Sequence, residues 1–290
     1  MLPIIRKPFR RLMSELRDLS GHQTRLRTEL AEVQQTMAQI TPGNPAVHGY
    51  KIYSQCDEDG IIEHIFGVLG DGYRTFVEIG CSDGLENNTH ALLLKGWRGI
   101  WLDADAKKIS TVRRQLPESS QLTVQCSFVT RSNAQTLLPE LVKTLDVPSI
   151  DFLSVDIDGD DLGVVSCLIR GPIRPRVICV EYNAKFPPPM KVAVMPQRST
   201  RWRGDDYQGA SLSSLCDDLA THGYRLVACN ATGANAFFVK CPADASFPTY
   251  PIELLYQPAR YHLRRLNSGH PASLAFLADA LLQASEKSAR

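Results

Sequence analysis

Acidic residues follow four short apolar runs in this 290-residue chain. Glu78 lies at the end of the run 76–79, and Asp103 follows the run 99–102. Asp156 and Asp158 follow the run 151–155, and Glu181 and Asn183 come at the end of the run 177–181. Such runs are typical of buried parallel strands, and ligands bind where the carboxyl ends of these strands meet. We therefore expect these acids to gather around one site.

The turn Gly80-Cys81-Ser82-Asp83-Gly84 indicates which ligand that site would hold. A carboxylate about 20 residues beyond such a turn, here Asp103, is placed to accept both hydroxyls of an adenosine ribose. Glu78 and Asp83 would repel a pyrophosphate, whereas they suit the ammonium group of S-adenosylmethionine (SAM), which has no phosphate. We therefore predict SAM as the cofactor. A nicotinamide-dependent oxidoreductase is less favoured because the turn lacks G-x-G-x-x-G, and an ordinary tight turn is the plain alternative.

The second acidic group indicates the chemistry beside that cofactor. A hydroxyl is a weak nucleophile near neutral pH, so its methylation needs a carboxylate that takes the proton or a metal that lowers the hydroxyl pKa. We predict Asp156, Asp158, Glu181 and Asn183 as catalytic residues, with Mg²⁺ as a candidate metal held by Asp156, Glu181 and Asn183. Asp156 has a turn-capping alternative, but capping rarely needs the four acids found between 156 and 161.

Five short motifs together resemble the FkbM-type SAM-dependent methyltransferases. They are Tyr53-Ser54-Gln55-Cys56-Asp57-Glu58-Asp59-Gly60-Ile61-Ile62, Val77-Glu78-Ile79-Gly80, Asp156-Ile157-Asp158-Gly159, Val180-Glu181-Tyr182-Asn183 and Gly209-Ala210-Ser211-Leu212. The resemblance covers about residues 50 to 242 and implies methyl transfer to a hydroxyl, on the saccharide of a surface glycan or natural product. It also implies a cofactor site that includes Gln55, Ser82, Ser127, Phe128 and Asp156. Asp158 stands where the family often has a glutamate, which leaves the role of this carboxylate open.

Apolar runs alternate with amphipathic segments from Lys51 onward, which predicts a Rossmann-like, doubly wound α/β sheet. The runs 224–229 and 236–240 flank the turn 230–233 and predict a closing hairpin, similar to strands six and seven of class I methyltransferases. We therefore expect a seven-stranded methyltransferase domain over residues 51–245 and a helical extension over 246–290.

The first 40 residues show a 4-3 apolar repeat that predicts a coiled coil. On this interpretation residues 1–41 form a helix that makes the protein a homo-oligomer, and 42–50 form a linker. Two alternatives stay open: an amphipathic helix that lies on its own domain, and a basic end, 6–11, that rests on an anionic membrane surface. The seam consists of Ile5, Phe9, Leu12, Leu16, Leu19, Gln23, Leu26, Leu30, Val33, Met37 and Ile40.

The long stretch 184–208 predicts a lid over the acceptor. Its Arg201 and Arg203 suit an anionic glycan, and Trp202 suits a sugar ring. A solvated loop is an equal alternative. A net charge of +1 gives no reason to expect a nucleic-acid partner.

The eight cysteines show no C-x-x-C spacing and indicate free thiols in a reducing compartment. Without a visible signal peptide or spanning helix, we expect a cytoplasmic protein, with the inner face of the membrane as an alternative location. The alternative from another functional class is a non-catalytic scaffold, in which the coiled coil assembles partners around an enzyme domain that has lost its activity.

Overall fold

A computed structural model describes the backbone of residues 6–195 and 202–288, and the side chains of 20–195 and 202–286. Its strands form one seven-stranded sheet of order β3-β2-β1-β4-β5-β7-β6, in which β1 to β5 are parallel and β7 is antiparallel to both of its neighbours. The strands are β1 (Thr75–Ile79), β2 (Arg98–Asp103), β3 (Leu122–Cys126), β4 (Phe152–Val155), β5 (Val177–Glu181), β6 (Tyr224–Cys229) and β7 (Asn235–Lys240). This strand order is that of the class I methyltransferase fold, so the predicted fold class is confirmed.

Helices cover both faces of the sheet, which explains why its strands are apolar without alternation. Phe76 packs into a core with α2, α3 and α4, while its neighbour Val77 packs into a second core with α5, α6 and α7. The helices are α2 (Glu58–Leu69), α3 (His90–Leu94), α4 (Ala106–Gln115), α5 (Arg131–Lys143), α6 (Asp161–Arg170) and α7 (Leu212–Thr221). Helix α5 begins at Arg131, where Thr130 and Asn133 form a capping box.

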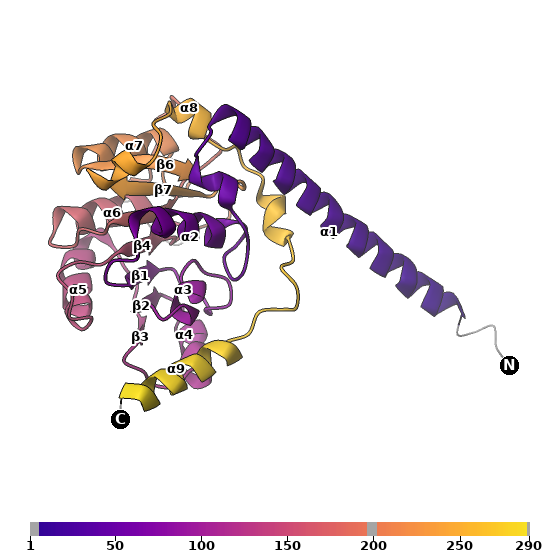
Figure 1. Cartoon of the computed structure of the whole chain (residues 1–290), viewed down its shortest axis with the longest axis horizontal. Helices are drawn as coiled ribbons and strands as arrows, with labels where there is room; N and C mark the ends of the chain where they lie inside the picture. The colour runs from indigo at the N-terminus through magenta and orange to yellow at the C-terminus, as the bar shows by residue number, and fades with distance from the viewer. Residues whose placement is uncertain (1–5, 196–201, 289–290) are drawn as a thin grey trace.

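The packing of the first helix differs from the predicted coiled coil over the second half of the seam. Helix α1 (Arg6–Ile40) runs along the body over its second half and projects from it over its first half (Figure 1). Leu26, Leu30 and Met37 are buried within the same core as Leu263 of the 3₁₀ helix η4 (Tyr261–Arg265). These seam positions are covered by the chain itself, as in the alternative of an amphipathic helix on its own domain. Of the remaining seam, Ile5 lies outside the described residues, and the side chains of 9–19 are not described.

The segments next to this helix and at the C-terminus also pack on the domain. The expected linker contains a 3₁₀ helix, η1 (Pro45–His48), in which Pro45 and Ala46 are buried. The C-terminal segment contains η3 (Ala243–Ser246), α8 (Ile252–Leu255), η4 and α9 (Ala275–Ser288), and α9 packs on α3. None of the helices in the described parts of the chain combines the length and the apolarity that a membrane span requires.

Candidate active site

A cavity of about 870 Å³ lies at the carboxyl ends of the parallel strands. It has two ends that differ in character. The turn after β1 and the residues after β2 and β3 form one end, and the residues after β4 and β5 form the other. The lining residues that the sequence predicted are Gln55, Glu78, Gly80, Ser82, Asp83, Asp103, Ser127, Phe128, Asp156, Asp158, Glu181 and Trp202.

Gly80 and Asp103 determine the shape of the first end. Gly80 has a φ of 97°, and a Cβ added there would lie 1.7 Å from the carbonyl oxygen of Asp156, so only glycine fits at this position. The Asp103 carboxylate accepts the backbone N–H of Ser82 at 2.8 Å and that of Asp105 at 2.7 Å, one on each oxygen. Each oxygen keeps a free lone pair, so the carboxylate can still accept two hydroxyl groups.

Glu78 is a buried carboxylate in the wall of this first end. One oxygen accepts the backbone N–H of Asn88 at 2.8 Å, and the other accepts the hydroxyl of Thr89. Burial raises the pKa of Glu78 to about 7, although these two donors act in the opposite direction. A cation beside Glu78 would therefore favour its ionised form.

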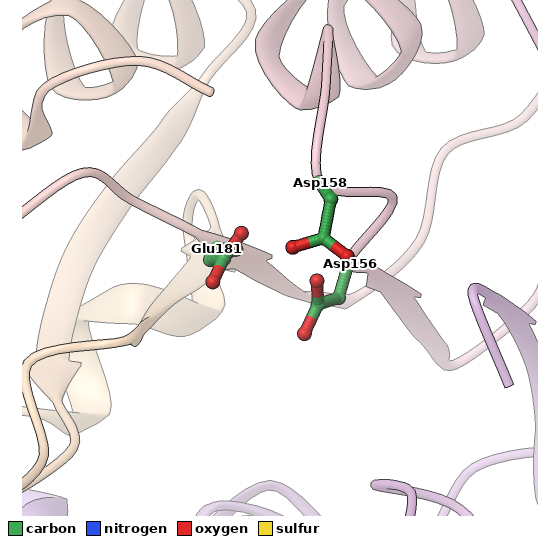
Figure 2. A group of neighbouring side chains, drawn as sticks. All are labelled: Asp156, Asp158 and Glu181. Carbon is green, nitrogen blue, oxygen red and sulfur yellow. The ribbon is translucent and has the colours of Figure 1, made fainter. Parts of the chain in front are cut away.

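Three carboxylates converge at the second end of the cavity. One oxygen each from Asp156, Asp158 and Glu181 lies within 4.8 Å of the other two, and Figure 2 shows these side chains turned toward one another. We call these three residues the acidic trio. Burial and the charge of Asp158 raise the pKa of Asp156 to about 6. Burial and the charges of Asp156 and Asp161 hold the pKa of Glu181 well above its usual range. The trio is therefore a place where a positive charge is stabilised.

Asp161 holds the loop that presents two members of the trio. Its carboxylate is fully buried and accepts the backbone N–H of Ile157 at 2.8 Å and that of Gly159 at 3.1 Å. These two bonds fix the turn that contains Asp158, which has a positive φ of 52°. Asp160, the N-cap of α6, is paired with Arg131 and accepts the N–H of Gly163. Both acids therefore have structural roles around the helix start.

Asn183 is not brought into the acidic trio. Its side-chain amide donates to the carbonyl oxygens of Asp206 at 2.9 Å and Gln208 at 3.1 Å, and its oxygen accepts the N–H of Lys185. Asn183 therefore fastens both ends of the long loop and is absent from the described cavity lining, while the catalytic and metal-ligand roles that we expected for it stay predictions. The loop residue Arg203 is absent from the described cavity lining, and Arg201 lies outside the described residues.

Arg264 is a cavity residue that sequence reasoning left unassigned. It lies on η4, and its Nη2 is 3.5 Å from Oε1 of Glu181. Its positive charge acts against the raised pKa values of Asp156 and Glu181. The basic stretch 260–265 was visible in the sequence, but no local pattern connects it to strand ends about 80 residues earlier. Asn235 and Lys108 also line the cavity and were not predicted.

Comparisons with known proteins leave the family of the chain open. No protein-family model matches the sequence, and no curated protein matches it either. Among solved structures, the chain is similar to the N-terminal domain of EvdMO1 with SAH bound (12% identity, 72% of this chain and 94% of that chain, TM-score 0.40). It is also similar to SAM-bound CalS10, an amino pentose methyltransferase from Micromonospora echinaspora involved in calicheamicin biosynthesis (12% identity, 64% and 92%, TM-score 0.40). Likenesses this remote carry no argument, so the fold assignment stands on the strand order alone.

Proposed function

We propose that this protein is a SAM-dependent O-methyltransferase that acts on a hydroxyl group of a saccharide. One observation carries the proposal: a single cavity joins the Asp103 carboxylate at the end of β2 to the acidic trio at the ends of β4 and β5. The first feature suits a nucleoside and the second suits a positive charge with a nearby proton acceptor. The predicted relationship to FkbM-type enzymes remains part of this proposal.

The residues at the first end fit SAM in size and in charge. A cavity of about 870 Å³ falls in the range of small-molecule sites. Gln55 lines it and has a buried side-chain oxygen without a hydrogen-bond partner among the described residues, which leaves an acceptor for a ligand. Asp103 would accept the ribose hydroxyls, Glu78 and Asp83 would attract the ammonium group, and Phe128, 53% exposed, offers an aromatic surface for adenine.

The trio would supply the proton chemistry. SAM, when bound, supplies a methyl group activated by a sulfonium sulfur. The acceptor hydroxyl must lose a proton as its oxygen becomes bonded to that methyl carbon, and Asp156 is our candidate to accept it. A carboxylate with a pKa of about 6 is mainly ionised at neutral pH and is a stronger base than an ordinary aspartate. Asp158 and Glu181 would orient the acceptor.

The acidic trio favours a neutral saccharide over an anionic one, because its carboxylates in the cavity would repel an anion. Among the described lid residues, Lys185 is paired with Asp206 and Lys191 with Asp217, and neither lysine lines the cavity. Trp202 lines the cavity and is 49% exposed, and its ring is a candidate surface for a sugar. We therefore propose a neutral sugar hydroxyl as the acceptor.

Mg²⁺ at the acidic trio is the alternative to a base that acts without a metal. The trio offers the oxygen ligands that Mg²⁺ prefers. The guanidinium of Arg264 beside Glu181 opposes a second cation at the same place. When the titration that tests for the cofactor is run with and without Mg²⁺, SAM binding that depends on Mg²⁺ would favour the metal.

Calorimetric titration of SAM and its demethylated product into wild type and Asp103→Ala tests the proposal. We expect micromolar binding that weakens at least about tenfold in Asp103→Ala, because two hydroxyl acceptors are lost. Glu140→Gln, an exposed helix position, is the matched control and should bind like wild type. Absence of binding in wild type would favour the non-catalytic scaffold, and tight binding of NADH without SAM binding would favour the oxidoreductase.

A further inference from the structure

Arg264 reaches the acidic trio from a segment outside the sheet domain. Its side chain is 30% exposed, and its guanidinium stacks on Tyr261 with 4.5 Å from Cζ to the ring centroid. Its separation from Glu181 exceeds that of a close ion pair. Its Nε is buried and has no hydrogen-bond partner among the described residues. The ring of Tyr261 therefore supports the guanidinium, and Arg264 lines the cavity beside the trio.

Helix α1 holds the backbone around Arg264. The Gln23 amide donates to the carbonyl of Arg265 at 3.0 Å and accepts the N–H of Asn267 at 2.8 Å. Arg27 donates to the carbonyl of Asn267 at 3.1 Å. Leu263, the neighbour of Arg264, is fully buried in a core that includes Leu26 and Leu30 of α1. Two segments from opposite ends of the chain thus support one side chain.

We propose that Arg264 is a specificity-determining residue of the acceptor end: a fixed guanidinium that takes the place of a free cation beside the acidic trio, with α1 as the brace that positions it. The cavity wall near it contains the three carboxylates of the trio, so one fixed positive charge changes which ligands can enter. A free divalent ion or a cationic acceptor competes with Arg264, whereas a neutral acceptor does not. The name acceptor end rests on the proposed function, whereas the effect of Arg264 on the charge of the cavity can be measured without SAM or an acceptor.

Mn²⁺ is the probe for the first half of the proposal, with binding measured by electron paramagnetic resonance of the free ion. Arg264→Met removes the charge and should bind Mn²⁺ at least about tenfold more tightly than wild type. Arg264→Lys keeps a cation and should stay within about threefold of wild type. Asp158→Asn added to Arg264→Met should abolish the gain, which assigns the bound ion to the trio. Equal Mn²⁺ affinity in wild type and Arg264→Met would overturn the proposal.

The brace is tested with Gln23→Ala combined with Arg27→Gln, which leaves the apolar contacts of α1 in place. We expect this double variant to bind Mn²⁺ more tightly than wild type and less tightly than Arg264→Met, because the guanidinium is then less firmly placed. Arg25→Gln is the control, since Arg25 lies on an exposed part of the same helix. Circular dichroism checks that α1 stays folded. A folded double variant with wild-type Mn²⁺ affinity would overturn the bracing role of α1, whatever SAM binding shows.

Discussion

Buried charge is the main feature of this molecule at the scale of single residues. Glu78, Asp161 and Glu181 are buried carboxyls and Asp156 is half-buried, and each has a pKa raised mainly by burial. Asp161 and Glu78 are satisfied by donors of the chain itself. Within the described parts of the chain, Arg264 is the positive charge that opposes the raised pKa values of Asp156 and Glu181. The residues with the least local compensation are thus those we assign to the acceptor.

The close approach of the backbone to Gly80 gives a prediction on stability. Gly80→Ala should destabilise the fold by at least about 2 kcal/mol, because a Cβ would clash with the backbone of Asp156 at a positive φ. Gly67→Ala is the contrast: this exposed glycine in α2 has no atom within 4 Å of an added Cβ, so alanine should stabilise by about 0.5–1 kcal/mol. Urea unfolding measures the free energy of unfolding of both variants. Equal changes in the two variants would show that the Asp156 backbone does not approach Gly80 this closely.

Asp57 gives a prediction on how the stability of the fold depends on pH. Burial, followed by the charge of Glu58, raises its pKa from an ordinary value of 3.8 to about 7. The folded protein therefore holds a proton more tightly than the unfolded chain, so a contribution to stability that is present below about pH 4 is lost as the pH rises to about 7. Asp57→Asn cannot ionise, and its melting temperature should fall less than that of wild type over this range. Exposed Asp71→Asn should follow the wild-type curve in the same thermal melts.

The sequence allowed most of the lining at the first end of the cavity to be predicted and only part of the lining at the second end. The spacing from Gly80 to Asp103 belongs to one β-turn-α-β unit, so local geometry fixes their distance. Asn183 has no such constraint, because its amide can bond to any carbonyl of the loop that follows. Arg264 depends on how the C-terminal segment folds back, which no periodic pattern encodes.

At the scale of elements, the second half of α1 behaves as a part of the domain. A 4-3 repeat predicts one apolar stripe on a helix but does not say what covers it. Here the chain's own η4 covers Leu26 and Leu30. Self-association or membrane contact through residues 6–19 remains a prediction, and the strands were easier to predict because burial on both faces leaves them uniformly apolar.

Leu26→Ala tests whether this packing occurs within one chain. Leu26 is 3% exposed, and its truncation should cost about 2–3 kcal/mol of unfolding free energy. Ile40→Ala, at a seam position that is 50% exposed, should change stability by less than about 0.5 kcal/mol. The loss in Leu26→Ala should not depend on protein concentration. A melting temperature that rises with concentration in wild type alone would instead indicate that Leu26 packs between chains.

At the scale of the whole molecule, both terminal segments pack into the core on the face of the sheet that α2, α3 and α4 cover. The structure places α9 on α3, and an added Cβ at Gly84 would lie 3.4 Å from Leu274, just before α9. In Figure 1 the chain after α8 passes along the side of the body that faces α1 and reaches α9 below α4. The turn at the first end of the cavity is therefore backed by the end of the chain.

SAM binding should accordingly change the amide hydrogen exchange of α9. We expect SAM to slow amide hydrogen exchange in α3 and α9, because a ligand that orders the turn 80–84 also orders Leu274 against it. Helix α7 packs on the opposite face of the sheet and should show no change, which makes it an internal control. Mass spectrometry of peptic peptides with and without SAM gives this comparison, and unaltered exchange in α9 would show that the two are uncoupled.

The support of Arg264 by two segments outside the sheet has a consequence for protein engineering. The sheet and its turns contain the residues that we assign to the cofactor, whereas α1 and η4 supply the cation of the acceptor end. Helix α1 and η4 can therefore be exchanged as a matched pair with α9 kept, as a way to alter acceptor preference while the first end of the cavity stays constant. If either α1 or η4 were transplanted alone, the contacts between them would be lost and Arg264 would no longer be held beside the acidic trio.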